Sequence, residues 1–319
     1  MKLLCSHCDL DSIFSLLANK FYNLGFDKTI STNYGERGEH ETLKTMGKDD
    51  LVVYTDFTPD AEAREIIQNN GIKFEIHDHH ESQVNDINEW MKSYSNGFYN
   101  YDVEKCGSKI YYDYLKSKGY ESNSVLDEFV ELVNTYDLWH KDSPLWEKAQ
   151  NLNRLLFKMI NWAKKDSAEK FDFFIDGVIW KCNNMKHYEF SEFEQKKIDA
   201  DIKQEDDLFN EFVNKKRLIK TRKDEKGNYF AIIKLQKKVS SICNRLLEKY
   251  KGLSYIICIN DYDKENPKIS VRSKDDFNIL VFNEVKGHEN AGGWENPTQQ
   301  ISEDLWDNKV HGLTYRLED

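Results

Sequence analysis

The segment that decides the fold is K-L-L-C-S-H-C-D-L-D-S, residues 2–12. It begins with a short apolar run, which is typical of a buried strand, and its polar end precedes a helical pattern. His7, Asp9 and Asp11 come directly after the apolar run, two residues apart. Side chains two residues apart in extended chain point to the same side. We therefore predict that these three side chains converge on one locus.

Strand-like and helix-like patterns alternate from this segment through residue 160. Strands are predicted at 2–5, 50–57 and 72–77, and helices at 12–24, 59–69, 106–116 and 125–139. Such alternation predicts an α/β fold with a mostly parallel sheet flanked by helices. Ligands of these sheets gather at the carboxyl ends of the strands, where the polar clusters of this chain lie.

Two further predicted strands also end in metal-binding residue types. Asp56 closes one strand, and Asp78, His79 and His80 follow the next. A single Asp after a strand is usually a helix cap or a turn residue. Recurrence at three successive strand ends favours a metal site instead. The mixture of carboxylate and imidazole suits Mn, Fe, Zn or Co better than Ca, and there are enough ligands for two ions that share a carboxylate.

The pattern C-S-H-C at residues 5–8 imitates half of a zinc or redox motif, but no second C-x-x-C follows it. We interpret Cys5 as a buried strand residue and Cys8 as a small residue of the metal-binding loop. The six cysteines are scattered along 319 residues, so we expect neither a disulfide framework nor a structural zinc.

The composition indicates a folded, acidic protein. Hydrophobic residues make up 39% of the chain, and 56 acidic against 45 basic residues give a net charge of -11. Long nucleic acid is bound largely by neutralising its phosphates, so an acidic chain argues against a long polymer as partner. A short phosphate ester held by metal ions remains compatible with the charge.

The apolar stretches also bear on location. Only Leu3, Leu4 and Cys5 are apolar near the start, and no run approaches the ~18 apolar residues of a membrane span. We therefore expect a cytoplasmic protein without a membrane partner. The oligomeric state stays open, with a homodimer as one option.

The second half is predicted to contain a connector and a smaller α/β unit. Residues 186–217 are rich in charge, and we interpret them mainly as a solvated helix, with one partly buried stripe as the alternative. Strands are predicted beyond it at 228–236, 253–260 and 268–273, and a helix at 239–249. The predicted domains are 1–185 and 218–319, joined by a helical linker at 186–217.

The motifs of the first domain occur in a familiar order. H-x-D-x-D at 7–11 is followed by the strand that ends in Asp56, by D-H-H at 78–80, and by Asp137 in N-T-Y-D-L-W. This arrangement resembles the DHH phosphoesterase superfamily. The resemblance implies that residues 1–185 form the catalytic DHH domain.

The C-terminal motifs extend the resemblance over nearly the whole chain. S-V-R-S at 270–273 and G-H-E-N-A-G-G at 287–293 resemble the arginine-bearing strand and the glycine-rich loop of the associated DHHA1 domain. The last unit would then be a DHHA1-like substrate-binding domain. Among family members the chain is most similar to the B-type nanoRNases, which are oligoribonucleases.

The resemblance also implies two divalent metal ions, with manganese expected. The implied ligands of one ion are His7, Asp9 and Asp56, and those of the other are Asp11, Asp56, His79 and Asp137. Asp56 would bridge the two ions and belong to the catalytic residues, together with Asp78 and His80. Asp78 would orient His79 or its neighbour, and His80 would contact the scissile phosphate.

Substrate binding is assigned by the same resemblance to the second domain. Arg272 and His288 would bind a phosphate or the terminal nucleotide, helped by backbone N–H groups around Gly287, Gly292 and Gly293. The sequence departs from the family where Ser12 replaces a glycine and where Val285 and Lys286 shorten the G-G-G-H run. These departures leave the implied metal ligands unchanged and bear on substrate size and direction of attack.

The implied activity is a two-metal-dependent phosphodiesterase that hydrolyses short oligonucleotides (nanoRNA) to mononucleotides. One alternative is a phosphodiesterase for cyclic dinucleotides or other signalling nucleotides, with an anti-immune role if the source is viral. A pyrophosphatase is less favoured, because such relatives carry a longer H-x-x-x-D-x-D spacing. A catalytically inactive binding module is disfavoured, because all six implied ligands are present.

Overall fold

The computed structural model describes residues 1–32, 38–160, 167–215, 219–260, 263, 267–274, 276–288, 290–294 and 297–307. The chain divides into two compact units, Met1–Ile198 and Asp199–Asp319. Each unit is built around its own sheet. The boundary between the units falls inside one long helix, α9 (Glu192–Asn214), and the predicted domain limits stay a prediction.

The sheet of the first unit confirms the predicted α/β fold. Its described strands are all parallel, in the order β2-β1-β3-β4-β5. They are β1 (Lys2–His7), β2 (Lys28–Thr32), β3 (Leu51–Thr55), β4 (Lys73–Asp78) and β5 (Gly97–Tyr101). The three predicted apolar runs form the central strands, because a sheet covered on both faces favours nearly continuous apolar strands.

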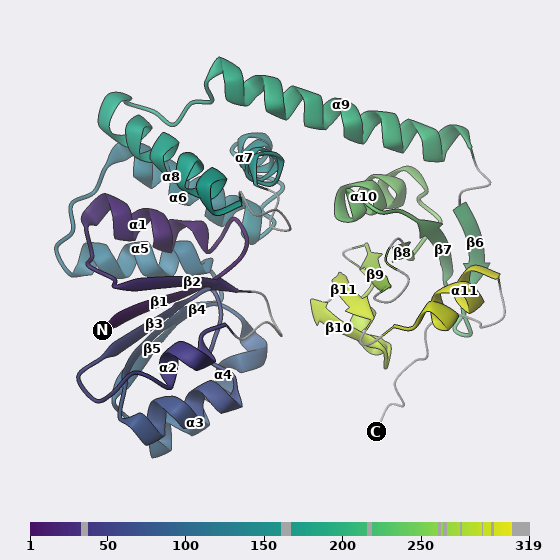
Figure 1. Cartoon of the computed structure of the whole chain (residues 1–319). Coiled ribbons are helices and arrows are strands. Elements are labelled where there is room, and N and C mark those ends of the chain that lie inside the picture. Colours follow the sequence, from purple (N-terminus) through teal and green to yellow (C-terminus); the bar gives the residue numbers. More distant parts are fainter. Residues whose placement is uncertain are drawn as a thin grey trace. The chain divides into compact units, whose positions relative to one another are not determined.

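Helices cover both faces of this sheet (Figure 1). One face carries α1 (Ile13–Tyr22) and α5 (Gly107–Ser117), and the other carries α2 (His40–Leu43), α3 (Ala61–Asn70) and α4 (Val84–Ser93). Alternate strand positions such as Leu3 and Cys5 are buried against the second group of helices. The helix predicted at 59–69 corresponds to α3, which ends at Gly71, a glycine with a φ of 69°.

Three more helices follow α5 in the first unit. They are α6 (Ser124–Asp137), α7 (Trp146–Met159) and α8 (Ser167–Asn184). α6 packs against α5 and α7, and it begins at Asn123, whose side chain accepts hydrogen bonds from the N–H groups of Val125 and Leu126. Its last residue is Asp137, so the packing of α6 on α5 brings this carboxylate to the site described below.

The second unit has a mixed sheet in the order β10-β11-β9-β8-β7-β6. Its strands are β6 (Ile219–Lys223), β7 (Tyr229–Lys234), β8 (Tyr255–Asn260), β9 (Lys268–Ser273), β10 (Val285–His288) and β11 (Ala291–Trp294), and its helices are α10 (Val239–Lys249) and α11 (Gln299–Asp307). Short 3-10 helices occur at Glu81–Gln83 in the first unit and at Ile279–Val281 in the second. β7 and β8 are parallel and joined through α10, and the other described pairs are antiparallel.

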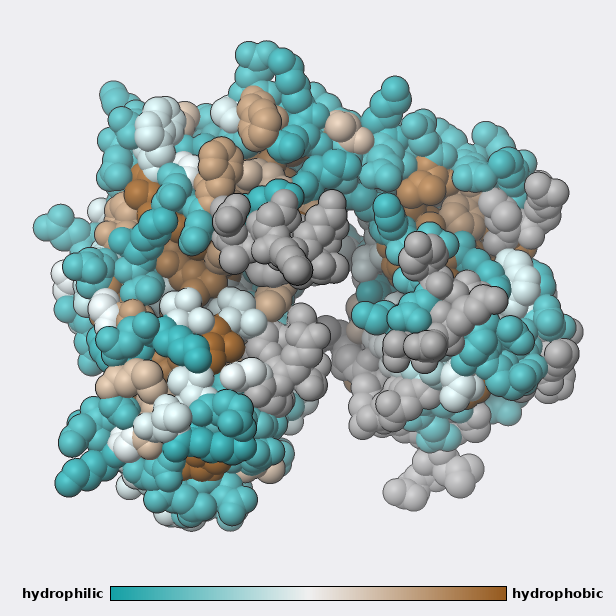
Figure 2. All heavy atoms as spheres, in the orientation of Figure 1, coloured by the Kyte–Doolittle hydropathy of each residue, from teal (hydrophilic) through white to brown (hydrophobic). Residues whose placement is uncertain are grey.

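The connector helix α9 has the partly buried stripe that was considered from the sequence. Hydrophilic residues cover most of its visible face in Figure 2, yet Ile198 and Phe212 are buried. Asp201 and Glu205 are buried too, with Lys238 and Arg245 as their partners. Most other positions of α9 are exposed or partly exposed, so α9 is a mostly solvated helix with the partly buried stripe that the sequence indicated.

The described helices and the cysteines bear on membrane spans and on disulfides. Among the residues that the structure describes, no helix combines the length and apolar character needed to cross a membrane. All six cysteines lie in the described ranges and are free thiols. Five of them are buried, and Cys8 is partly exposed.

Candidate metal centre

The candidate site lies at the carboxyl ends of the parallel strands. His7 is the last residue of β1, Asp56 directly follows β3, and Asp78 is the last residue of β4. The strand order reverses direction between β1 and β3, because the chain passes from β1 to β2 on one side and then to β3 on the other. Such a switch point leaves a crevice at the carboxyl ends, which is where open α/β sheets bind ligands.

The turn after β1 differs from the predicted extended chain. Residues 8–12 form bends and turns before α1 begins. His7, Asp9 and Asp11 are nevertheless brought to the same region, but the turn directs the two aspartates to different partners. Asp9 contacts His7, whereas Asp11 faces the start of α5. The side chains of residues 7–11 therefore do not follow the predicted strand alternation.

His7, Asp9 and Asp56 form the first group of potential ligands. The Nδ1 atom of His7 lies 2.7 Å from Asp9 Oδ2 and 3.8 Å from Asp56 Oδ2. The Ser12 hydroxyl lies between the two carboxylates, 2.9 Å from Asp9 Oδ1 and 3.2 Å from Asp56 Oδ2, so its single proton can be donated to either. Sequence reasoning noted Ser12 only as a departure from the family pattern and missed these contacts.

Asp11, His79 and Asp137 form the second group. The Nε2 atom of His79 lies 3.7 Å from Asp11 Oδ2 and 3.4 Å from Asp137 Oδ2. The same nitrogen lies 3.3 Å from Asp56 Oδ1. The two oxygens of Asp56 thus face different groups, and Asp56 is the residue that the groups share.

A third group adds the remaining residues of the D-H-H motif. Asp56, Asp78, His79 and His80 also offer ligand atoms within 4.8 Å of one another. Asp78 is fully buried, and its Oδ1 lies 2.8 Å from Nδ1 of His80. The structure therefore gives Asp78 contact with His80, the neighbour of His79, which was one of the two partners considered from the sequence.

The start of α5 holds Asp11 in place. Its two carboxylate oxygens accept hydrogen bonds from the N–H groups of Gly107 (2.6 Å) and Ser108 (2.8 Å). The positive end of a helix dipole favours an anion at this position. A side chain at Gly107 has no room, because its Cβ would lie 2.8 Å from Cβ of Asp56. Cys106 precedes this turn, and its N–H donates to Asn134 Oδ1 of α6 (3.0 Å).

The carboxylates of this site repel one another when no cation neutralises them. Burial raises the pKa of Asp56 well above its usual range, and the charges of Asp11, Asp9, Asp137 and Asp78 raise it further. Burial and neighbouring aspartates raise the pKa of Asp137 in the same way. Asp137 also stands at the C-terminal end of α6, where the helix dipole disfavours a negative charge. The local structure alone does not favour this concentration of carboxylates.

Two buried carboxylate oxygens bear on whether metal ions fit these residues. Among the described residues, Asp137 Oδ2 and Asp78 Oδ2 have no hydrogen-bond partner. Buried carboxylate oxygens without partners are costly unless a cation binds them. Burial lowers the pKa of His79, so its imidazole is neutral, the form that binds metals. These residues could therefore hold divalent metal ions.

Hydrogen bonds shift the pKa values of Asp9 and His80. Burial alone would raise the pKa of Asp9, but the hydrogen bond and charge of His7, with Ser12, lower it to about 2. Burial would lower the pKa of His80, and the hydrogen bond and charge of Asp78 outweigh it, so the pKa is raised. Asp9 is thus ionised over the whole physiological range.

The curated relatives of this chain are phosphodiesterases, although no family model matches it. The chain is 24% identical to oligoribonuclease NrnB of Bacillus subtilis over 302 residues, which cover 91% of this chain and 70% of that protein. It is 26% identical over 192 residues to a 3',5'-cyclic-nucleotide phosphodiesterase of Helicobacter pylori, covering 52% of this chain and 51% of that protein.

Solved structures share the fold. A pGpG-specific phosphodiesterase, PggH of Vibrio cholerae, matches with a TM-score of 0.54 and 14% identity over 97% of this chain and 96% of that one. The DHH domain of a member of the s1p family of ribosomal proteins matches with a TM-score of 0.53 and 12% identity, over 97% and 86%. By sequence the chain is thus similar to phosphodiesterases, and by fold it is similar to proteins that carry a DHH domain.

The match to oligoribonuclease NrnB confirms the resemblance that the motifs indicated. The protein is an enzyme of the phosphodiesterase class. The D-H-H motif that gives the superfamily its name occupies residues 78–80, at the end of β4.

The DHHA1-like unit carries the residues assigned to substrate binding. Arg272 lies in β9 and donates hydrogen bonds to the carbonyls of Val271 (2.8 Å) and Gly292 (3.1 Å) and to the Ser240 hydroxyl (2.9 Å). In the ladder Arg272 pairs with Ala291, which pairs with His288. Arg272 and His288 are therefore two strands apart at the same level of the sheet.

The glycine-rich segment of this DHHA1-like unit is a hairpin rather than the expected loop. Gly287 lies in β10, and Gly292 and Gly293 lie in β11. β11 is paired on both sides, so the ladder uses backbone N–H groups that the sequence had suggested as phosphate donors. The small size of these glycines remains compatible with close approach by a ligand over the sheet.

Proposed function

We propose that this DHH/DHHA1 enzyme hydrolyses short oligonucleotides to mononucleotides with the help of two divalent metal ions. One observation carries the proposal: two ligand groups share Asp56, whose oxygens face His7 on one side and His79 on the other. Carboxylate and imidazole together suit manganese, iron, zinc or cobalt, and we propose manganese.

The proposed ligands follow the two groups. His7, Asp9 and Asp56 would hold one ion, and Asp11, Asp56, His79 and Asp137 would hold the other. When bound, such a pair lowers the pKa of water and neutralises charge on the phosphate oxygens. The backbone N–H groups of Gly107 and Ser108 hold Asp11, and Ser12 holds Asp9 and Asp56, so the chain fixes the ligands in advance.

His80 is proposed to bind the scissile phosphate. Asp78 accepts from Nδ1 of His80 and so fixes both the ring orientation and the tautomer. The raised pKa of His80, which Asp78 causes, favours a protonated ring that can donate to a phosphate oxygen. Asp78 would act through this orientation, and Asp56 through the ions that it bridges.

The DHHA1-like unit is proposed to bind the rest of the substrate. Arg272 and His288 would contact a phosphate or the terminal nucleotide, and Gly287, Gly292 and Gly293 would leave room for it. The Arg272 guanidinium is oriented by its hydrogen bonds to two carbonyls and to the Ser240 hydroxyl. An oriented guanidinium of this kind suits phosphate recognition.

The relatives support a short substrate. Their names specify an oligoribonuclease, a cyclic-nucleotide phosphodiesterase and a pGpG-specific phosphodiesterase, so all three act on small nucleotides. The net charge of -11 agrees with a short substrate rather than a long one. The second candidate is hydrolysis of cyclic nucleotides, which the relative from Helicobacter pylori favours.

The test compares four substrates in the presence of Mn²⁺: a 5'-phosphorylated RNA dinucleotide, an RNA of about 24 nucleotides, a cyclic dinucleotide and pyrophosphate. We expect rapid mononucleotide release from the linear dinucleotide and slow action on the long RNA. Faster opening of the cyclic compound would move the enzyme to the second candidate. Turnover of none of the four would refute the proposed substrate class.

Asp56→Asn provides the matched active-site variant, because asparagine tolerates the positive φ of residue 56 (62°). We expect a fall in turnover of about 10³-fold or more, the scale of losing a key electrostatic group. Asp86→Asn makes the same chemical change on the exposed side of α4 and should keep full activity. Near-normal turnover by Asp56→Asn would refute its bridging role.

A further inference from the structure

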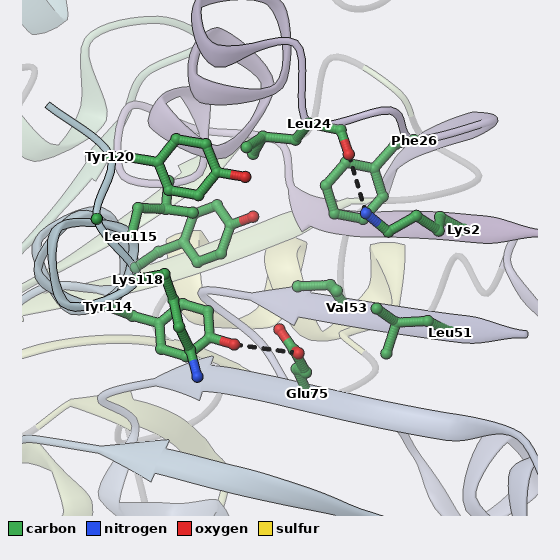
Figure 3. Close-up of a pocket in the computed structure, with 12 residues that line it drawn as sticks. Lys2, Leu24, Phe26, Leu51, Val53, Glu75, Tyr114, Leu115, Lys118 and Tyr120 are labelled. Atoms are coloured by element: carbon green, nitrogen blue, oxygen red, sulfur yellow. Dashed lines mark hydrogen bonds between the residues drawn. The ribbon is translucent and has the colours of Figure 1, made fainter.

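A pocket of about 300 Å³ lies at the opposite end of the first sheet from the candidate metal centre. Lys2 at the start of β1 and Leu51 at the start of β3 line it, together with residues from the C-terminal part of α5. Its volume is at the lower limit for small-molecule sites, large enough for a nucleobase with part of its sugar. Figure 3 shows the aromatic and charged side chains around it.

Glu75 is the unusual residue of this pocket. It lies on the central strand β4, on the face covered by α5, where neighbouring lining residues such as Val53 are apolar. Within the described part of the chain its carboxylate contacts two polar groups. The Tyr114 hydroxyl donates to Oε1 (3.2 Å), and His77 Nε2 lies 3.8 Å from Oε2. A half-buried carboxylate with so few donors has capacity to accept more.

Aromatic rings and two lysines complete the pocket. Tyr114, Tyr120 and Phe26 line it, and rings of this kind provide flat apolar surfaces for a base. Lys118 Nζ lies 5.1 Å from the centre of the Tyr114 ring. Lys2 Nζ lies 5.3 Å from the centre of the Phe26 ring.

The lysines, the carboxylate and the aromatic rings together indicate which ligand the pocket would bind. Two lysines disfavour an organic cation and favour an anionic group such as a phosphate. A carboxylate between aromatic rings favours a base with two adjacent N–H donors. Guanine offers such donors at N1 and at its 2-amino group, whereas adenine places an acceptor beside its amino group. A site built around Glu75 would therefore discriminate against adenine, because an acceptor would face the carboxylate.

We propose that this pocket binds a guanine mononucleotide, with the base on Glu75 and the phosphate on Lys118. The site is separated from the candidate metal centre by the length of the strands, since one lies at their amino ends and the other at their carboxyl ends. Binding there needs no metal ion and does not depend on the proposed function.

Isothermal titration calorimetry of the full chain in EDTA tests the site with GMP, AMP and guanosine. We expect GMP to bind at least tenfold more tightly than AMP. Glu75→Gln keeps the side-chain volume and an acceptor for Tyr114, and it should weaken GMP binding at least tenfold. Lys118→Met should weaken the binding of GMP and leave that of guanosine unchanged.

Two controls separate this pocket from the catalytic site and from general effects of substitution. Asp56→Asn should bind GMP as the wild type does, because the candidate metal centre is not involved. Glu65→Gln makes the same change on the exposed side of α3 and should also bind GMP normally. The proposal fails if GMP does not bind in EDTA, if AMP binds equally well, or if a correctly folded Glu75→Gln keeps wild-type affinity.

Discussion

Asp56 is held in a position that suits cation binding but is electrostatically unfavourable without a cation. It has a left-handed backbone conformation at the turn after β3, and its N–H donates to the His77 carbonyl (2.9 Å). Its side chain is buried among other carboxylates. The backbone contact fixes the side chain between the two ligand groups, so the geometry favours cation binding while the metal-free protein bears an electrostatic cost.

The pKa directions of Asp56 and Asp137 give the sign of a pH effect. Both pKa values are raised in the folded, metal-free protein. The folded state therefore holds protons more tightly than the unfolded state. This contribution to stability is fully present below the ordinary Asp pKa of about 4 and is lost as pH rises through the raised values. For these groups, the metal-free protein is less stable at pH 8 than at pH 5.

Asp56→Asn should remove part of this dependence. We expect the free energy of unfolding in EDTA to rise by about 1–2 kcal/mol at pH 8, with a smaller gain at pH 5. Urea unfolding at the two pH values measures it. Addition of Mn²⁺ should stabilise the wild type and have little effect on the variant. A variant that is less stable than the wild type at pH 8 in EDTA would contradict the electrostatic account.

At the level of secondary-structure elements, the start of α5 has room only for glycine at position 107. Gly107 lies against Asp56, and an added Cβ would approach Cβ and Cα of Asp56 at 2.8 and 2.9 Å. The segment C-G-S at 106–108 opens a helix, a pattern that suits anion binding, yet its partner Asp11 is 96 residues away in sequence. Only the tertiary fold reveals why glycine is needed there.

Gly107→Ala should displace Asp56 or α5. We expect a loss of about 1–3 kcal/mol in stability, as for other overpacked sites, and a clear fall in phosphodiesterase activity. Thermal unfolding and turnover of a dinucleotide measure the two effects. Gly177→Ala is the matched control, because nothing lies within 4 Å of its added Cβ in α8, and it should be neutral or slightly stabilising. Equal behaviour of the two variants would contradict the steric argument.

The elements predicted from sequence were those with a strong apolar signal. The runs that became β1, β3 and β4 are buried on both faces, and they were correctly identified as strands. β2 (K-T-I-S-T) and β5 (G-F-Y-N-Y) were missed because they lie at the edges of the sheet and lack a continuous apolar run. Glycines in β10 and β11 suggested a loop, since the pairing of these strands depends on distant β9.

The residue types and the predicted strand ends were enough to predict which side chains form the site. The motif order indicated which side chains come together, because carboxyl ends of parallel strands meet at one edge. The contacts of Ser12, Gly107 and Asn134 were not predictable, since each depends on the packing of helices against the sheet. The turn at residues 8–12 also escaped prediction, because alternation was assumed to continue past β1.

At the scale of the whole molecule, α9 belongs to both units. In the first unit its Glu194 pairs with Lys181 of α8 (2.6 Å), and the Lys181 ammonium also lies over the rings of Tyr188 and Phe190. In the second unit Asp201 and Glu205 pair with residues at α10. Each end of the connector is thus fixed by partly buried ion pairs within its own unit.

Lys181→Met should leave the buried Glu194 without its cation. We expect a loss of about 3 kcal/mol or more in the stability of the first unit, because breaking a buried pair leaves an uncompensated charge. Lys196→Met removes a similar pair with Glu192 in which both side chains are more than 70% exposed, and it should cost less than about 0.5 kcal/mol. Chemical unfolding of both variants provides the comparison, and similar losses would contradict the role of burial.

The burial of five of the six thiols has a practical consequence for spectroscopy. Cys8 is the partly exposed one, and it stands between His7 and Asp9 in the loop of the candidate metal centre. Mild alkylation of the native protein should modify this position before the buried ones. A fluorescent or spin label could thus be attached beside the site without engineering the chain, and its signal would report directly on occupancy by a paramagnetic ion.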